Sequence, residues 1–196
     1  MHIGYFQGMN FIAANMLVSL RNNDEATFWG MIQMFSRFQL EELYDTASLK
    51  FKVLTYQIEV ILFEQMPKLA DFVLNKMEVS LDIYTVRWFF SMFNIDLTFT
   101  YSQTVLDLYM FDQSEVLIRT TLALFKVLQP KILSTPDSES LHDILKEVSS
   151  NLDFKMQAKS EFFATAYNFD LPTTVLKELE ECFRRGKTHT EALAEI

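Results

Sequence analysis

The short run from Gly4 to Gly8 holds the residues of this sequence whose types and spacing could do chemistry. Two of the four glycines of the chain flank Tyr5, Phe6 and Gln7 there. Because glycine permits backbone angles and close approaches that a Cβ forbids, this spacing predicts a tight turn that presents the residues between the glycines. Gln7 offers a neutral amide with two donors and an acceptor, which can orient a water molecule but cannot act as a nucleophile or an acid.

From the residues alone, two interpretations of Gln7 stay open. In the first, the amide forms hydrogen bonds within its own turn and has a local structural role. In the second, it orients an attacking water, as glutamines do in GTP hydrolysis, where positioning and electrostatics do nearly all the work.

The rest of the sequence offers little for catalysis or for a metal. The three histidines, His2, His142 and His189, are scattered. None lies four residues from another histidine or from the single cysteine, so we expect no metal site. Neither a nucleotide-binding loop nor a serine nucleophile motif is present. Cys182 recurs at helical spacing with apolar residues, which predicts a small core residue and no disulfide.

Composition narrows the class of protein further. The chain has 196 residues, 49% of them hydrophobic, and a formal net charge of −9. An acidic chain without clustered Lys and Arg is a poor binder of nucleic acid. We find neither a run long enough to span a bilayer nor a signal peptide, and therefore expect a cytoplasmic protein or one peripheral to a membrane.

Helical patterns recur throughout, whereas strand patterns are nearly missing. Asn22 and Asp24 are candidate caps, Asn22 and Glu25 have the spacing of a capping box, and Ser114 is a candidate cap further on. Pro67 is placed as a first-turn proline, and Gly186 as the stop of the last helix. The expected helices cover about Ala26–Arg37, Ser48–Gln65, Pro67–Met77, a helix opened by Ser80 or Asp82, Thr100–Met110, Val116–Leu133, Leu141–Ser149, Phe154–Tyr167 and Thr173–Arg185.

These elements predict an all-α, multi-helix fold with no sheet. The polar stretch 134–140 is the clearest linker. It separates a helical region, 1–133, which carries Gln7, from C-terminal helices of the same domain, 141–196.

The run Ile3–Asn10 resembles the glutamine-finger motif of the TBC domain, the family of GTPase-activating proteins for Rab GTPases. That motif is written Tyr-x-Gln-Gly-Met and leads into an apolar helix. One later landmark departs from the family, because Leu106 stands where a Trp is common, although the following Asp107 is kept. The other landmarks that resemble the family, in order, are Asp24–Trp29, Met66–Leu69, Trp88–Phe93 and Leu117–Leu124.

The resemblance implies a C-terminal part of a TBC domain that accelerates GTP hydrolysis by a Rab-type GTPase in vesicle trafficking. Gln7 would be the catalytic finger, and Tyr5, Phe6, Gly8 and Asn10 would contact the GTPase. GTP and Mg²⁺ would belong to the partner, and this chain would bring no cofactor. The implied location is the cytoplasm, including the periphery of endomembranes.

One feature of the family has no counterpart here. Its second finger is an Arg in an Ile-x-x-Asp-x-x-Arg motif upstream of the glutamine motif, where this sequence begins. We therefore expect exposed apolar surface and weak stimulation of a Rab by this chain alone. The arginines that match later parts of the family are expected to be structural or rim residues: Arg21, Arg37, Arg87 and Arg119.

Two other functions remain as hypotheses. An incomplete TBC fold could be a non-catalytic helical module that binds a Rab, with Gln7 as a contact. A helical scaffold unrelated to Rabs would leave the ordered landmarks unexplained. Within the resemblance to the TBC domain, Trp29 and Trp88 are expected in the core, and Asp107 is expected to be a buried or helix-end acid.

Overall fold

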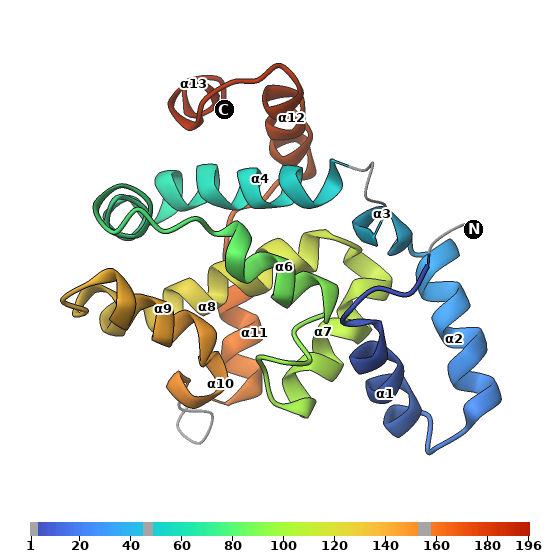
Figure 1. Ribbon diagram of the computed structural model, residues 1–196. Helices are drawn as coiled ribbons and strands as arrows, with labels where there is room; N and C mark the ends of the chain where they lie inside the picture. Colours follow the sequence, from blue (N-terminus) through green and yellow to red (C-terminus); the bar gives the residue numbers. More distant parts are fainter. Residues whose placement is uncertain (1–3, 45–48, 153–157) are drawn as a thin grey trace. The chain divides into compact units, whose positions relative to one another are not determined.

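The computed structural model describes residues 4–44, 49–152 and 158–196, and every regular element within these ranges is a helix (Figure 1). The predicted all-α fold is thus confirmed. The chain forms two compact units that alternate along the sequence, one from residues 1–51 and 83–117, the other from 52–82 and 118–196. Three predicted positions lie outside the described residues: Ile3 in the motif, and Ser48 and Phe154 at the expected starts of two helices.

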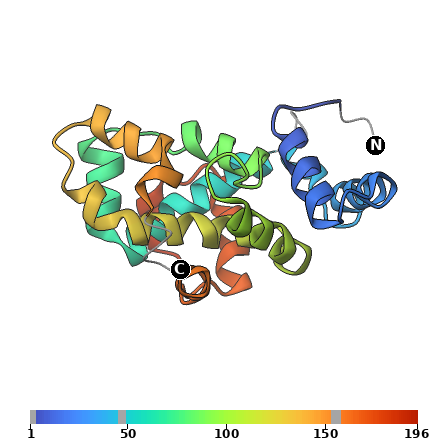
Figure 2. The same cartoon turned by 90° about the horizontal axis from the view of Figure 1, so that it is seen from below.

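The first unit is built around the helix that follows Gly8. In it α1 and α2 lie side by side in both ribbon views, and α1 also contacts α7 (Figures 1 and 2). The nearly buried Asn15 of α1 donates to Asn94 Oδ1 at 2.6 Å and to Ser102 Oγ at 3.2 Å. The unit contains α1 (Met9–Ser19), α2 (Asp24–Ser36), α3 (Glu41–Tyr44), nearly all of α6 (Asp82–Phe90) and α7 (Phe99–Asp112).

Helix α2 begins at Asp24, two residues before the expected Ala26, and its N-cap is neither of the predicted candidates, Asn22 and Asp24. Asn23, in an extended conformation, is the N-cap, and its side chain accepts a hydrogen bond from the Ala26 amide at 2.9 Å. Asn22 has a φ of 59° and belongs to the preceding turn. The expected capping box of Asn22 and Glu25 is therefore wrong, because Asn22 does not have the extended backbone of a cap.

Aromatic rings fill the core of this unit. Trp88 of α6 is almost fully buried and stacks on Phe93 with ring centroids 6.0 Å apart, as its predicted core position requires. Phe93 lies in the turn after α6, with a φ of 59°. The expectation for Asp107 is wrong, because it is exposed in the middle of α7.

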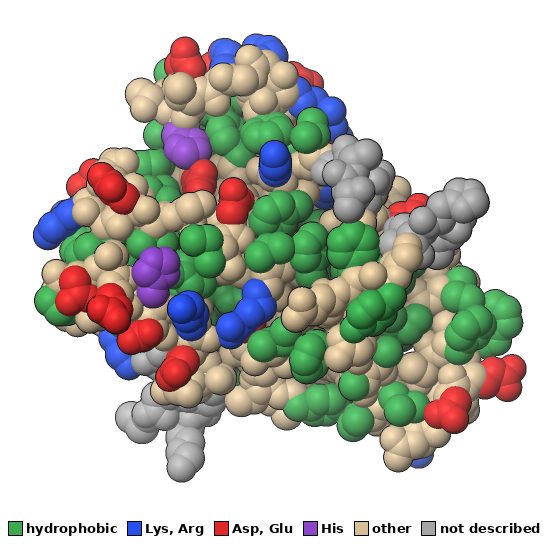
Figure 3. Space-filling view, viewed as in Figure 1, with side chains coloured by type: hydrophobic (Ala, Val, Ile, Leu, Met, Phe, Trp, Pro, Cys, Tyr) green, Lys and Arg blue, Asp and Glu red, His purple; other side chains and the backbone are tan. Residues whose placement is uncertain are grey.

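Trp29 was also expected in the core, and that prediction is wrong. Its side chain is 55% exposed beside Phe28, whose ring lies 5.4 Å away. Figure 3 shows hydrophobic side chains gathered over α1 and α2. The large apolar side chains exposed in the first unit are Tyr5, Phe11, Val18, Leu20, Phe28, Trp29, Leu49, Ile83, Ile95, Phe99, Met110 and Phe111.

Much of α4 is buried in the second unit. Gln57 of α4 donates to the Leu176 carbonyl of α12 at 2.7 Å, and Arg119 of α8 donates to the Phe169 carbonyl at 3.1 Å. Pro67 opens α5 as predicted. The helices are most of α4 (Lys50–Gln65), α5 (Pro67–Ala70), η1 (Asp71–Lys76), most of α8 (Glu115–Leu133), α9 (Ser138–Lys146), α10 (Val148–Asn151), α11 (Lys159–Tyr167), α12 (Thr173–Arg184) and α13 (His189–Leu193).

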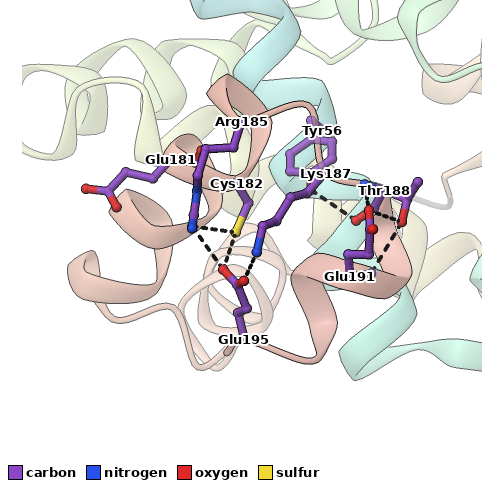
Figure 4. A network of polar contacts seen from close by, with 8 residues as sticks. All are labelled: Tyr56, Glu181, Cys182, Arg185, Lys187, Thr188, Glu191 and Glu195. Carbon is purple, nitrogen blue, oxygen red and sulfur yellow. Dashed lines mark hydrogen bonds and ion pairs between the residues drawn. The ribbon is translucent and has the colours of Figure 1, made fainter.

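The C-terminal helices of this unit are joined by a polar network (Figure 4). Cys182 is buried on α12, as predicted, and its thiol donates to Glu195 Oε2 at 3.3 Å. Arg185 and Lys187 form ion pairs with the same carboxylate. Gly186 follows α12 with a φ of 70°, the left-handed conformation that ends many helices, which confirms the predicted stop.

The segment 134–140 is partly helical. Helix α9 begins at Ser138, three residues before the expected start at Leu141, because Asp137 caps it by accepting from the Ser140 amide at 2.8 Å. The division of the chain into 1–133 and 141–196 around this segment stays a prediction.

Candidate functional site

Gln7 lies on a turn that leads directly into α1. The Met9 amide donates to the Phe6 carbonyl at 3.2 Å, which closes the turn around Gln7, and the Phe11 amide donates to the Gly8 carbonyl at 3.0 Å. The Gln7 side chain is exposed, whereas the following Gly8 is buried. The turn that the two glycines predict is therefore present, with the amide on its outer side.

Gly8 is the glycine that this turn requires. Its φ is 113°, and a Cβ at this position would lie 2.3 Å from the carbonyl oxygen of Phe90. Any other residue would be strained both by its backbone angle and by this contact. Gly4 differs, because a Cβ there would meet open space. Of the two glycines, only Gly8 packs closely against the C-terminal end of α6.

Phe6, on the other side of Gln7, is held by an aromatic cluster. Its ring centroid lies 5.6 Å from that of Tyr44 and 6.1 Å from that of Phe90, and the Tyr44 and Phe90 rings stack at 5.1 Å. The Tyr44 hydroxyl donates to the Phe90 carbonyl at 2.5 Å, and burial raises the pKa of this phenol above its ordinary value of 10.0. Both neighbours of Gln7 are therefore anchored on α6.

A pocket of about 390 Å³ opens beside this turn, with the turn as one wall and the end of α6 with the residues that follow it as the other. Its lining is mostly apolar, with one amide and one guanidinium. The lining residues are Phe6, Gln7, Gly8, Val86, Arg87, Phe90, Ser91 and Ile95.

The guanidinium of Arg87 is engaged by Asp96. Its Nε donates to Asp96 Oδ2 at 3.0 Å, and its Nη2 bonds the other carboxylate oxygen. Desolvation raises the pKa of the buried Asp96 carboxyl, while the hydrogen bond and charge of Arg87 oppose that shift. The pair closes the turn after α6, so Arg87 has the structural role expected of it.

The other arginines singled out in the sequence do not share this pocket. Arg119 belongs to the second unit, where its guanidinium lies 5.0 Å from the Tyr167 ring centroid and bonds backbone carbonyls. Arg37 lies 5.8 Å from the ring centroid of Phe38, and Arg21 is exposed in the turn before α2.

Tyr5 and Asn10 lie on the outer side of the same turn. Tyr5 is 73% exposed, and its hydroxyl donates to the side-chain oxygen of the exposed Asn10 at 3.2 Å. Of the predicted site residues, Tyr5 and Asn10 thus face outward, and Phe6 and Gly8 anchor the turn. Gln7 is exposed and lines the pocket together with Phe6 and Gly8.

Sequence reasoning missed Tyr44, Phe90, Asp96 and the role of Arg87 beside the turn. They come from α3, α6 and the turn after α6, and no local pattern in those segments indicates a contact with Gln7. Across the described ranges, no group of three or more His, Cys, Asp or Glu side chains could hold a metal ion, and no helix is long and apolar enough to cross a membrane.

Comparisons with known proteins identify the family of this chain. The family model of the Rab-GTPase-TBC domain matches residues 1–133. Among curated proteins, TBC1 domain family member 2A of Mus musculus is 28% identical over 144 residues, covering 74% of this chain and 15% of that protein. Rab GTPase-activating protein eat-17 of Caenorhabditis elegans is 22% identical over 193 residues, covering 97% of this chain and 21% of that protein.

A solved structure has the same fold. The Chlamydomonas flagellar RabGAP TBC domain superposes with a TM-score of 0.68 at 20% sequence identity, covering 84% of this chain and 53% of that one. The chain therefore spans about half of this solved domain and about a fifth or less of the two curated relatives. With a family match over 133 of its 196 residues, this chain belongs to the Rab-GTPase-TBC domain family.

Proposed function

We propose that this region takes part in activating GTP hydrolysis by a Rab-type small GTPase, with Gln7 as the finger that orients the attacking water. Membership in the Rab-GTPase-TBC family and the similarity to a protein named as a Rab GTPase-activating protein support the class of activity. GTP and Mg²⁺ belong to the GTPase, and this chain brings amide and backbone groups. The proposed setting is vesicle trafficking, in the cytoplasm or at the surface of endomembranes.

The observation that carries the proposal is the combination of an exposed Gln7 and an anchored turn. Gly8 and Phe6 are both packed against α6, yet the amide between them stands in solvent at the edge of a pocket. Phosphoryl transfer needs little covalent chemistry from an activator and depends on positioning, so a pre-placed amide is the kind of group that can contribute.

The turn and its pocket form the proposed contact surface for the GTPase. Tyr5 and Asn10 present polar groups on the outer side of the turn, beside the Gln7 amide. Phe6 and Gly8 contribute pocket lining next to that amide. We assign direct contacts with the GTPase to these four residues, with water orientation reserved for Gln7.

The family's arginine finger has no match in these 196 residues. An arginine finger contributes about 10³–10⁵-fold in rate, so its source decides how fast the reaction can be. Activity should therefore be measured with the full native chain that contains this region, alongside residues 1–196 alone. We expect residues 1–196 alone to stimulate hydrolysis weakly.

The test is phosphate release under single-turnover conditions from a panel of GTP-loaded Rab GTPases. Gln7→Ala should lower the maximal rate on the order of 10²-fold, the loss typical of one transition-state hydrogen-bond donor, with little change in affinity. Gln33→Ala is the matched control, because Gln33 is an exposed glutamine on α2 of the same unit.

Two results would contradict the assignment. Full activity of Gln7→Ala would show that the amide is not a finger. A proportional loss of affinity and rate would make Gln7 a binding contact, and the alternative function, a non-catalytic module that binds a Rab, would then hold.

A further inference from the structure

Tyr44, the last residue of α3, contacts Phe6, which precedes Gln7, and Phe90, against which Gly8 packs. Its side chain is 1% exposed, its ring lies edge-on to Phe6, and its ring stacks on Phe90. Its hydroxyl donates a 2.5 Å hydrogen bond to the Phe90 carbonyl. Tyr44 is thus a buried residue, distant from Gln7 in the sequence, that packs against the turn.

The carbonyl oxygen of Phe90 links Tyr44 to the turn that holds Gln7. Phe90 is the last residue of α6, and the final carbonyls of a helix have no partner within that helix. The same oxygen lies where Gly8 comes closest to α6, 2.3 Å from the position of a Cβ. One oxygen therefore accepts the Tyr44 hydroxyl and supports the backbone that follows Gln7.

We infer that Tyr44 is a positioning residue for Gln7. Its hydroxyl holds the Phe90 carbonyl under Gly8, and its ring holds Phe6, so both ends of the turn are fixed by one side chain. This inference rests on the proposed function of Gln7 as a water-orienting finger. Tyr44 itself touches neither the GTPase nor the reacting water; it keeps the amide in place before the transition state forms, which avoids an ordering cost at that moment.

A tyrosine that only fills the core would affect stability and not the turn, so the two roles are separable. Tyr101 of α7 provides the matched control. It is a buried tyrosine of the same unit, on a helix other than α3 and α6. Tyr44→Phe and Tyr101→Phe each remove one buried hydroxyl and keep the ring.

The first experiment needs no GTPase. Hydrogen exchange of the Met9 amide, which closes the turn by bonding the Phe6 carbonyl, reports how often the turn opens. Tyr44→Phe should accelerate this exchange about fivefold, the factor that corresponds to one typical intramolecular hydrogen bond. Tyr101→Phe should leave it unchanged. Equal effects of the two variants would overturn the inference.

The second experiment is a double-mutant cycle on phosphate release, using the full native chain and the Rab that it stimulates most. Tyr44→Phe should lower kcat about fivefold with KM unchanged, and should cost nothing further in a Gln7→Ala background, because its effect passes through Gln7. An equal loss of kcat in both backgrounds would overturn the inference.

The outcomes separate this inference from the proposed function. If Gln7→Ala leaves kcat unchanged, the proposed function fails, and the inference that Tyr44 positions a catalytic amide fails with it, even if the exchange result shows that Tyr44 holds the turn. If Gln7→Ala abolishes stimulation while Tyr44→Phe matches Tyr101→Phe, the finger stands and the role of Tyr44 is refuted.

Discussion

Replacing Gly8 by alanine tests whether the turn is fixed by its contact with α6. The backbone φ of 113° is one that residues with a Cβ rarely adopt, and it costs about 1–3 kcal/mol for such a residue. The new methyl carbon would also lie 2.3 Å from the Phe90 carbonyl oxygen and 2.7 Å from its carbon. Overpacking of this kind adds about 1–3 kcal/mol, because a backbone carbonyl cannot move aside like the end of a flexible side chain.

The two costs need not add in full, since the turn can shift partway off α6. We therefore expect Gly8→Ala to lower the free energy of unfolding by about 2–4 kcal/mol, measured by urea denaturation with far-ultraviolet circular dichroism. Gly4→Ala is the control in the same turn, because its methyl group meets open space, and it should change stability by less than about 0.5 kcal/mol.

Gly8→Ala and Gly4→Ala should also differ in activity. If Gly8→Ala shifts the turn, Gln7 moves with it, and stimulation of a Rab should fall even at temperatures where the protein remains folded. A Gly8→Ala protein with the stability and hydrogen exchange of Gly4→Ala would refute the close contact between Gly8 and α6.

Three further predictions concern other parts of the chain. Trp29 is exposed and Trp88 is buried, so Trp29→Phe should remove the fluorescence component that acrylamide quenches readily and leave a blue-shifted one. Burial raises the pKa of the Asp96 carboxyl above 3.8. The stability that this group contributes is therefore present at low pH and lost as the pH rises through the raised pKa. Asp96→Asn should flatten the pH dependence of the free energy of unfolding in this range. The buried Cys182 thiol bonds Glu195, so Glu195→Ala should speed its labelling by a thiol reagent, with little change in melting temperature because the ion pairs are partly exposed.

Elements with strong local patterns were predictable from the sequence. Pro67 opens α5, and Gly186 follows α12 in a left-handed conformation, because a proline ring and a missing Cβ act within one or two residues. The all-α class followed from helical periodicity in the same way. The turn around Gln7 was also predictable, although the need for glycine is confirmed only at Gly8.

Predictions that depended on distant partners were less successful. Trp29 and Trp88 are the same residue type in two apolar helices, yet Trp88 is buried and Trp29 is exposed, and no local pattern distinguishes them. Asn22 was predicted as a cap, but the adjacent Asn23 is the cap, and the choice depends on the positive φ angles of the turn. Tyr44 could not be assigned to the site, because its contacts with Phe6 and Phe90 arise only when α3 and α6 pack together.

The central claim, that Gln7 acts in the transition state of a Rab's GTP hydrolysis, is tested most directly by comparing two complexes. One contains the GTPase loaded with GDP, Mg²⁺ and aluminium fluoride, which imitates the transition state, and the other a GTP analogue that is not hydrolysed. We predict that Gln7→Ala weakens the first complex on the order of 10²-fold and leaves the second within about twofold, since only transition-state contacts accelerate the reaction. Equal weakening of both complexes, or of neither, would contradict the claim.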